Sequence, residues 1–177
     1  LAGEVHRHGA AVLYATGAMN VAWAIDAKTG RQIWTHKVGK LSAASPAYHD
    51  GRIFVVTLSG RVVALSAKSG NIKWAKRLDS RSESSPLILG RSVIFGSESG
   101  KLYRLRQSTG RTEWVFRAGG AIKGGAAYAN GKLYVGAYGG SVYAVRAKNG
   151  RLVWRSSTQG ARFGFGSGNF YATPAVA

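Results

Sequence analysis

The sequence predicts an all-β protein, a β-propeller of about four four-stranded antiparallel blades that repeat every 40 residues or so. The first observation is four tryptophans spaced 40 residues apart, at Trp34, Trp74, Trp114 and Trp154. The second is a glycine four positions before each of them, at Gly30, Gly70, Gly110 and Gly150. The third is the run of short β-branched and aromatic segments bounded by Gly, Ser and Asn, with no sustained helical periodicity. Four-stranded repeats of this length are typical of propeller blades.

Each repeat is expected to form four short strands that run as a meander. The first strand carries a Ser-Pro segment such as 45–48, and the next two are β-rich runs such as 52–57 and 61–65. A turn at Gly60, or at its equivalents Gly100 and Gly140, separates those runs, and the fourth strand is expected to end at the tryptophan. The chain is therefore one domain over 1–177, with blades at about 1–38, 39–78, 79–118 and 119–158.

The tryptophans are expected to pack between neighbouring blades rather than to bind a ligand. Each is the largest apolar side chain of its unit, and a unit of this size cannot bury its own faces without neighbours. The glycines that accompany them tolerate positive φ and mark turns. The sequence thus assigns a structural role to both sets.

The chain is strongly basic, with 25 Lys and Arg against 7 Asp and Glu and a formal charge of +18. Such an excess favours an acidic partner, for example an anionic polymer. Many of the bases repeat with the fold, however, and Lys37, Arg77 and Arg117 follow the tryptophans, where charge protects an exposed sheet edge from aggregation. Because neither a stacking motif nor a groove-entering helix is visible, nucleic acid is not a favoured partner.

Several classes of site have no support in the sequence. Cysteine is absent, which excludes disulfides, thiolate metal sites and a cysteine nucleophile. The four histidines show no clear metal spacing and no nucleophile elbow occurs, so we assign no catalytic residue and no metal site. No apolar run approaches the roughly 20 residues that span a bilayer. No export signal opens this segment, so such a signal is expected outside it.

The unit Ala-x-Asp-Ala-Lys-Thr-Gly-x-x-x-Trp at 24–34, followed by Ser-Pro-Ala at 45–47, resembles the pyrroloquinoline-quinone-type propeller repeat, also called quinoprotein-like. That repeat builds quinoprotein dehydrogenases, outer-membrane assembly lipoproteins of the BamB kind and sensor regions of some bacterial Ser/Thr kinases. The resemblance covers essentially the whole chain. It implies that the tryptophans belong to a blade-docking motif and that the protein is extracytoplasmic, periplasmic or on the cell surface of a bacterium.

The sequence departs from the dehydrogenases at the cofactor. The soluble enzymes cover their quinone with a vicinal cysteine pair, which this chain lacks. Their calcium and catalytic positions are carboxylates and an asparagine in central loops, whereas only Glu83 and Glu98 are expected there, beside Arg81 and Lys123. Calcium takes about six to eight oxygen ligands. We therefore expect no cofactor in this segment, and pyrroloquinoline quinone with calcium only if the segment is part of a dehydrogenase.

The end of the chain indicates a partial propeller. Thr173-Pro174 looks like another Ser-Pro strand, but its proline follows Trp154 by about twenty residues instead of twelve. Family members usually carry about eight blades, so we expect a seven- or eight-bladed parent, with 159–177 starting a further blade; alternatively this segment closes a four-bladed ring. An isolated arc would expose apolar faces. It would then pair with the remaining blades of the parent or form a homodimer that completes a ring.

Residues that break the repeat in the loops near the central axis are the candidate contacts for a ligand or partner. They are Arg81, Glu83, Glu98, Lys123, Tyr138, Arg162, Phe163 and Phe165. The basic members would face an anionic ligand, and the phenylalanines would supply a contact surface.

Together these features favour a non-catalytic scaffold or binding module that presents a basic central loop face to a protein or an anionic partner. One alternative is a fragment of a quinone-dependent dehydrogenase. Another is the extracytoplasmic sensor region of a bacterial Ser/Thr kinase.

Overall fold

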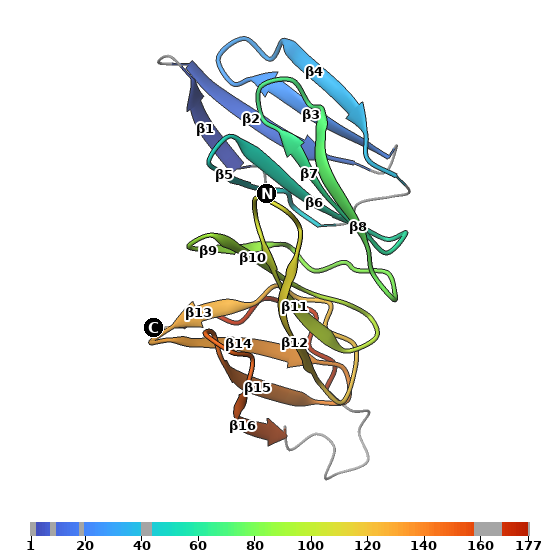
Figure 1. Ribbon diagram of the computed structural model, residues 1–177, viewed down its shortest axis with the longest axis vertical. Helices are drawn as coiled ribbons and strands as arrows, with labels where there is room; N and C mark the ends of the chain where they lie inside the picture. Colours follow the sequence, from blue (N-terminus) through green and yellow to red (C-terminus); the bar gives the residue numbers. More distant parts are fainter. Residues whose placement is uncertain (1–2, 8–9, 18–19, 40–43, 158–167, 177) are drawn as a thin grey trace.

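The computed structural model describes residues 3–7, 10–17, 20–39, 44–157 and 168–176. Over these residues it contains strands and turns only, arranged as four antiparallel four-stranded sheets, which confirms the predicted fold class (Figure 1). Blade 1 consists of β1 (Gly3–Arg7), β2 (Ala10–Thr16), β3 (Val21–Asp26) and β4 (Gln32–Lys37). Blade 2 consists of β5 (Ala47–His49), β6 (Arg52–Thr57), β7 (Arg61–Ser66) and β8 (Ile72–Arg77). Blade 3 consists of β9 (Leu87–Leu89), β10 (Ser92–Gly96), β11 (Lys101–Arg106) and β12 (Thr112–Arg117). Blade 4 consists of β13 (Ala127–Ala129), β14 (Lys132–Ala137), β15 (Ser141–Arg146) and β16 (Leu152–Ser157).

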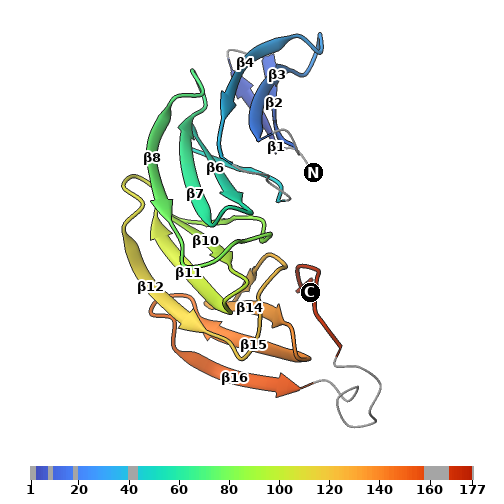
Figure 2. The ribbon, with the colours of Figure 1, turned by 90° about the vertical axis from the view of Figure 1, so that its right-hand side faces the viewer.

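The blades stand side by side along an open arc. Within each sheet the strands are hydrogen-bonded in chain order, so every blade is a simple meander. Figure 2 shows the four sheets fanned out, with the C-terminal segment 168–176 on the concave side. Among the described residues, no helix is long and apolar enough to cross a membrane.

The turns between the first two strands of blades 2 and 4 follow from their sequence. Asp50 and Gly51 both have positive φ, at 45° and 68°, and Asn130 and Gly131 repeat this at 49° and 74°. Asp-Gly and Asn-Gly pairs favour the tight hairpin turn that needs two such residues. These turns lie at the end of the sheets opposite the turns between the second and third strands.

The fourth strand of each blade does not end at the tryptophan as we expected, but continues for three residues beyond it, to Lys37, Arg77, Arg117 and Ser157. A register shift next to the tryptophan's partner residue, for example between Ala64 and Leu65 opposite Trp74, inserts one extra residue into this strand. Such a bulge bends the strand and lets its pairing continue. The bulge recurs in all four blades.

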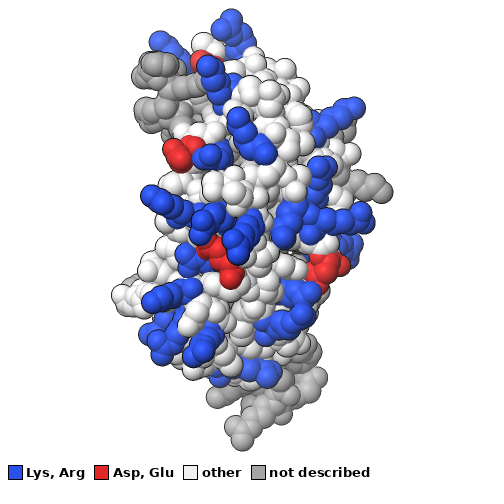
Figure 3. Space-filling view, in the orientation of Figure 1, with Lys and Arg blue, Asp and Glu red and all other residues white. Residues whose placement is uncertain are grey.

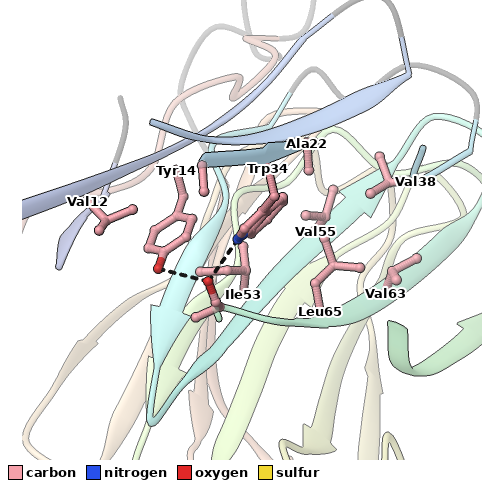
Figure 4. Packing of buried hydrophobic residues seen from close by; sticks show 11 residues of the cluster. Val12, Tyr14, Ala22, Trp34, Val38, Ile53, Val55, Val63 and Leu65 are labelled. Carbon is pink, nitrogen blue, oxygen red and sulfur yellow. Dashed lines mark hydrogen bonds between the residues drawn. The ribbon is translucent and has the colours of Figure 1, made fainter. Parts of the chain in front are cut away.

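The hydrophobic core lies between the blades. In β6, Ile53 and Val55 pack into a cluster with Val12 and Tyr14 of blade 1 (Figure 4). Phe54 packs on the other face into a cluster shared with blade 3. Successive side chains of a strand point to opposite faces of its sheet. A strand of a blade that lies between two other blades therefore carries apolar side chains on both faces. Burying each such side chain contributes about 1.5–3 kcal/mol.

Each tryptophan of the first three blades joins its blade to the next. The indole N–H of Trp34 donates to the carbonyl of Ala67 at 2.9 Å, and the equivalent bonds of Trp74 and Trp114 reach Gln107 at 2.7 Å and Ala147 at 3.0 Å. Figure 4 shows Tyr14 sharing the first of these carbonyls. The ring also covers a glycine: a Cβ atom added at Gly70 would lie 2.6 Å from Trp34, and Gly110 and Gly150 are covered by Trp74 and Trp114 in the same way.

In the two outermost blades this contact between indole and glycine is incomplete among the described residues: blade 1 has the glycine without a covering indole, and blade 4 has the indole without a glycine beneath it. Gly30 has φ of +70° like its equivalents, yet an added Cβ there would meet no atom within 4 Å. Trp154 is 42% exposed, and its neighbours Leu152 and Val153 are exposed as well. The arc therefore ends in an uncovered glycine socket on blade 1 and an uncovered indole on blade 4.

Candidate functional site

The candidate residues lie in two kinds of segment at the same edge of the sheets. Arg81 and Glu83 follow β8 and Lys123 follows β12, so they belong to the connections between blades, whereas Glu98 and Tyr138 lie in the turns after β10 and β14. Hydrogen bonds tie the two kinds together, because the amide of Glu98 donates to the carbonyl of Arg81 at 3.0 Å and that of Tyr138 to Ala121 at 2.9 Å.

Two buried serines fix the connection that carries Arg81 and Glu83. Ser82 donates through Oγ to the carbonyl of Gly96 at 2.6 Å, and Ser84 Oγ accepts from the amide of Gly96 at 2.9 Å. Both serines have no exposed surface. The backbone of this connection is therefore anchored to β10, and the side chains of Glu83, between the serines, and Arg81, just before them, project from a fixed base.

The structure brings five of the predicted site residues together, and we call them, with Tyr171, the central cluster. Arg81 Nε lies 2.7 Å from Glu98 Oε2, and Lys123 Nζ lies 3.5 Å from Glu83 Oε2 and 3.6 Å from Glu98 Oε1. The Lys123 ammonium group also sits over the ring of Tyr138, 5.1 Å from its centroid. Lys123 thus links two carboxylates and an aromatic face.

Tyr171 joins the cluster from the C-terminal segment, and the sequence analysis did not single it out. Its ring meets that of Tyr138 edge to face at 4.8 Å between centroids, and Lys123 Nζ lies 5.7 Å from it. Tyr171 is 64% exposed. The signal that would have found it is its place next to Thr173-Pro174, at the start of the segment that looks like a further blade.

The electrostatics of the central cluster hold Lys123 in its charged form. Burial lowers the pKa of Lys123, but the carboxylates of Glu83 and Glu98 outweigh it, so the pKa is raised overall. Burial and the nearby Tyr171 raise the pKa of Tyr138, which keeps that hydroxyl protonated at neutral pH. Two cations face two carboxylates, so the cluster is close to neutral.

Two buried oxygens of this cluster have no hydrogen-bond partner. They are Glu98 Oε1 and Tyr138 Oη, and no other buried side-chain N or O atom of the described residues is in this state. A buried polar group without a partner costs about 1–3 kcal/mol. The cluster therefore has unused hydrogen-bonding capacity.

The cluster does not fit a calcium–quinone site. Glu83 and Glu98 are the two carboxylates that the sequence placed in the central loops, where the dehydrogenases hold their calcium, and the ammonium group of Lys123 pairs with both. A calcium ion there would meet a like charge and far fewer than its usual six or so oxygen ligands. Among the residues that the structure describes, no group of three His, Cys, Asp or Glu side chains is placed to hold a metal.

Three of the predicted contact residues, Arg162, Phe163 and Phe165, lie outside the described residues.

Arg104 and Gln107 form a second polar group that the sequence analysis missed. Arg104 donates to Ser92 at 2.9 Å and to Glu113 at 2.8 Å, and it also donates to the carbonyl of Ala147 across the seam. Arg104 and Gln107 stand where the other repeats have alanine, for example Ala64 and Ala67. This departure from the repeat is the signal in the sequence that would have identified them.

The comparisons with known proteins agree with this architecture. The family described as outer membrane protein assembly factor BamB matches residues 18–164. The chain belongs to this family. BamB from Moraxella catarrhalis superposes with a TM-score of 0.74 at 25% identity, over 88% of this chain and 52% of that one. No curated protein sequence matches the chain.

Two other solved structures share the fold. Quinohemoprotein alcohol dehydrogenase from Comamonas testosteroni has a TM-score of 0.74 at 18% identity, over 82% of this chain and 33% of the enzyme. The computationally designed protein Ika8 has a TM-score of 0.76 at 13% identity, over 98% of this chain and 52% of the design. The chain thus spans about half the length of the BamB structure and a third of the dehydrogenase.

Proposed function

We propose that this BamB-family chain is a non-catalytic binding module whose central cluster contacts a protein partner. The observation that carries this proposal is the pair of buried oxygens, Glu98 Oε1 and Tyr138 Oη, next to the exposed side chains of Arg81 and Tyr171. Arginine and tyrosine are the residue types that most often dominate the energetics of protein interfaces. A hydrogen-bond donor from a partner would satisfy Glu98.

The charge balance of the cluster favours a protein over an anionic polymer. Glu83 and Glu98 already pair with Arg81 and Lys123, so an acidic chain would have to compete with carboxylates held at 2.7–3.6 Å. A partner that offers a lysine, arginine or amide side chain needs no such displacement. The partner surface is therefore expected to be polar or basic at the point that meets Glu98.

The family supports a cellular setting for this partner. Its members are described as outer membrane protein assembly factors. We propose that the chain acts outside the cytoplasm of a bacterium, as a scaffold that holds another protein of the cell envelope.

We further propose that the tryptophan joints dock blades and that the two uncovered halves receive further blades, from the same parent chain or from a second copy. The C-terminal segment favours a further blade next to blade 4. The amide of Gly125 donates to Thr173 Oγ1 at 3.0 Å, just as the amide of Ser45 donates to Ser85 Oγ at 3.2 Å between earlier repeats. Thr173 therefore makes the contact that the first strand of a following blade makes.

Site-specific photo-crosslinking in the bacterium tests the central cluster. A photoreactive phenylalanine derivative replaces Tyr171 in the full-length parent protein, and the matched control replaces Tyr128, which is 45% exposed and lies outside the cluster. We expect one defined protein adduct at position 171, weakened by Glu98→Gln, and none at position 128. Equal adducts at both positions, or an adduct at 171 that Glu98→Gln leaves unchanged, would rule out the proposed contact.

The dehydrogenase alternative has its own test. Pyrroloquinoline quinone and calcium are added together, and the visible absorbance and melting temperature are followed. We expect neither to change, because Lys123 lies where the cation would bind. A saturable spectral change would favour the enzyme instead.

A further inference from the structure

A cleft opens between blades 2 and 3 at the edge of the sheets opposite the central cluster. Its volume is about 430 Å³, and its lining includes His49, Arg52, Arg91, Arg106, Gln107 and Glu113. These residues lie in or beside the β5–β6, β9–β10 and β11–β12 turns. Because strands alternate in direction, those turns lie at the other end of the sheets from Glu98 and Lys123. We propose that this cleft binds a phosphate-type oxyanion.

The charges around the cleft leave a positive excess. Arg52 pairs with Asp50 at 3.3 Å, and Arg106 lies 3.5 Å from Glu113 Oε1. The other oxygen of Glu113 already accepts from Arg104 at 2.8 Å. Three guanidinium groups thus share two carboxylates, and Arg91 adds a fourth positive charge to the lining of the cleft. Figure 3 shows basic side chains crowded around the middle of the molecule.

Arg91 is the guanidinium group that remains available. Its side chain is exposed, and it makes no hydrogen bond or ion pair with any of the described residues. Its backbone is nevertheless fixed, because the carbonyl of Arg91 accepts from the amide of Gln107 at 3.0 Å. A fixed backbone with an unpaired guanidinium at the rim of a basic cleft is suited to grip an incoming anion.

A buried amide orients the imidazole that faces the cleft. Gln107 is 4% exposed, and its Nε2 donates to the carbonyls of Gly90 at 3.0 Å and Ser92 at 2.9 Å. Its Oε1 therefore faces His49 Nδ1 at 2.7 Å, and that nitrogen must carry the proton because the amide oxygen can only accept. His49 is thus held in one orientation by a side chain that solvent does not reach.

The cleft is specific to this seam. The residues at the position of Gln107 in the other repeats are Ala27, Ala67 and Ala147, which cannot hold an imidazole. Glu113 stands at the bulge of its strand, between the paired residues Thr112 and Trp114. A bulge redirects a side chain out of the regular pleat. This placement lets one carboxylate order two arginines.

The chemistry of these groups selects the ligand. Guanidinium groups present parallel N–H donors that match the oxygens of a phosphate, and several around one cavity favour a compact dianion. A volume of about 430 Å³ falls within the range of roughly 300–1,000 Å³ that holds small ligands. The oxyanion could be free phosphate or the phosphate group of a small monoester.

Nuclear magnetic resonance of the ¹⁵N-labelled chain tests the site, with inorganic phosphate and glycerol 3-phosphate titrated separately at constant ionic strength. We expect saturable shifts at the amides of Arg91 and Ser108 and at the side-chain amide of Gln107, and none at Lys123 or Tyr138. Tighter binding of glycerol 3-phosphate would identify a monoester as the source, and equal binding would identify free phosphate.

Two variants make the test decisive. Arg91→Ala is expected to weaken binding about tenfold, because it removes the unpaired guanidinium, which corresponds to about 1.4 kcal/mol. Arg151→Ala removes an exposed arginine of blade 4 and is expected to change nothing. The spectra of both variants also report whether the fold is intact. Shifts that do not saturate, or that Arg91→Ala leaves unchanged in a folded protein, would overturn the proposal.

Discussion

Asp79 stands where the neighbouring repeats have Gly39 and Gly119, and it collects three donors from blade 3. Lys101 pairs with its carboxylate, Tyr103 donates to it at 2.6 Å and Ser99 at 3.1 Å. Burial raises the pKa of Asp79, but these hydrogen bonds outweigh it and lower the pKa to about 2. One residue that breaks the repeat thus ties the connection between two blades to β11.

The depressed pKa of Asp79 predicts how stability depends on pH. An unfolded aspartate has a pKa of about 3.9, so the stabilisation is fully present above that value and is lost as the pH falls toward about 2. The pKa values of Asp26 and Glu113 are also lowered and add to the same loss. Asp79→Asn should therefore reduce, but not abolish, the drop in urea stability between pH 4.5 and 2.5. An identical drop in both proteins would contradict this.

Except for Tyr171, the residues of the central cluster were predictable from the sequence because the repeat supplies its own reference. Arg81, Glu98 and Tyr138 differ from their equivalents, and equivalent loops of a propeller must meet near its axis. Arg104 and Gln107 break the register just as clearly but lie away from the axial loops. Arg104 reaches a carbonyl of the following blade and Gln107 an imidazole of the preceding one, and no pattern within one repeat encodes those contacts.

At the scale of the turns between strands, two glycines allow the energetic contribution of the contact between indole and glycine to be measured. Gly110 and Gly30 have nearly the same φ, +71° and +70°, but an added Cβ would lie 2.6 Å from Trp74 in the first case and would meet nothing in the second. Gly30→Ala should cost only the strain of a positive φ, about 1–2 kcal/mol.

Gly110→Ala should cost clearly more, by about 1–3 kcal/mol, because the ring of Trp74 must move. Chemical denaturation of both variants gives the difference directly. If the two substitutions destabilise equally, then the contact between indole and glycine contributes little.

The tryptophans offer a second matched pair. Trp114 is partly buried and donates to Ala147, so Trp114→Ala is expected to lower the free energy of unfolding by about 3 kcal/mol. Trp154 is 42% exposed, so Trp154→Ala is expected to cost less than about 1 kcal/mol in the isolated chain. A large loss from Trp154→Ala in a monomeric sample would show that its ring is covered in solution.

The number and order of strands followed from short apolar runs between turn residues, but their ends did not. The fourth strand of each blade passes its tryptophan because a bulge absorbs one residue, as between Arg104 and Leu105. The pairing after the bulge includes polar residues such as Lys37 and Arg77, which the sequence analysis placed at an exposed sheet edge. A ladder of backbone bonds extends these strands whatever the side chains are.

At the scale of the whole molecule, the uncovered socket at Gly30 and the uncovered indole of Trp154 predict self-association. Light scattering of residues 1–177 should give a mass of two chains or more. Trp154→Arg should lower that mass, because the charged side chain cannot replace the indole against a glycine. A compact monomer at micromolar concentration would contradict this expectation.

The two-sided burial of the inner strands has a consequence for how the molecule opens. Val55 and Val56 of β6 belong to different hydrophobic clusters, one on each face of the sheet. Unfolding of one blade therefore exposes an apolar face on each neighbouring blade. Nearest-neighbour coupling of this kind makes opening proceed from the ends of an array inward. Amide hydrogen exchange should then be slowest in β6, β7, β10 and β11 and fastest in β4 and β16, tracing a gradient of protection along the arc.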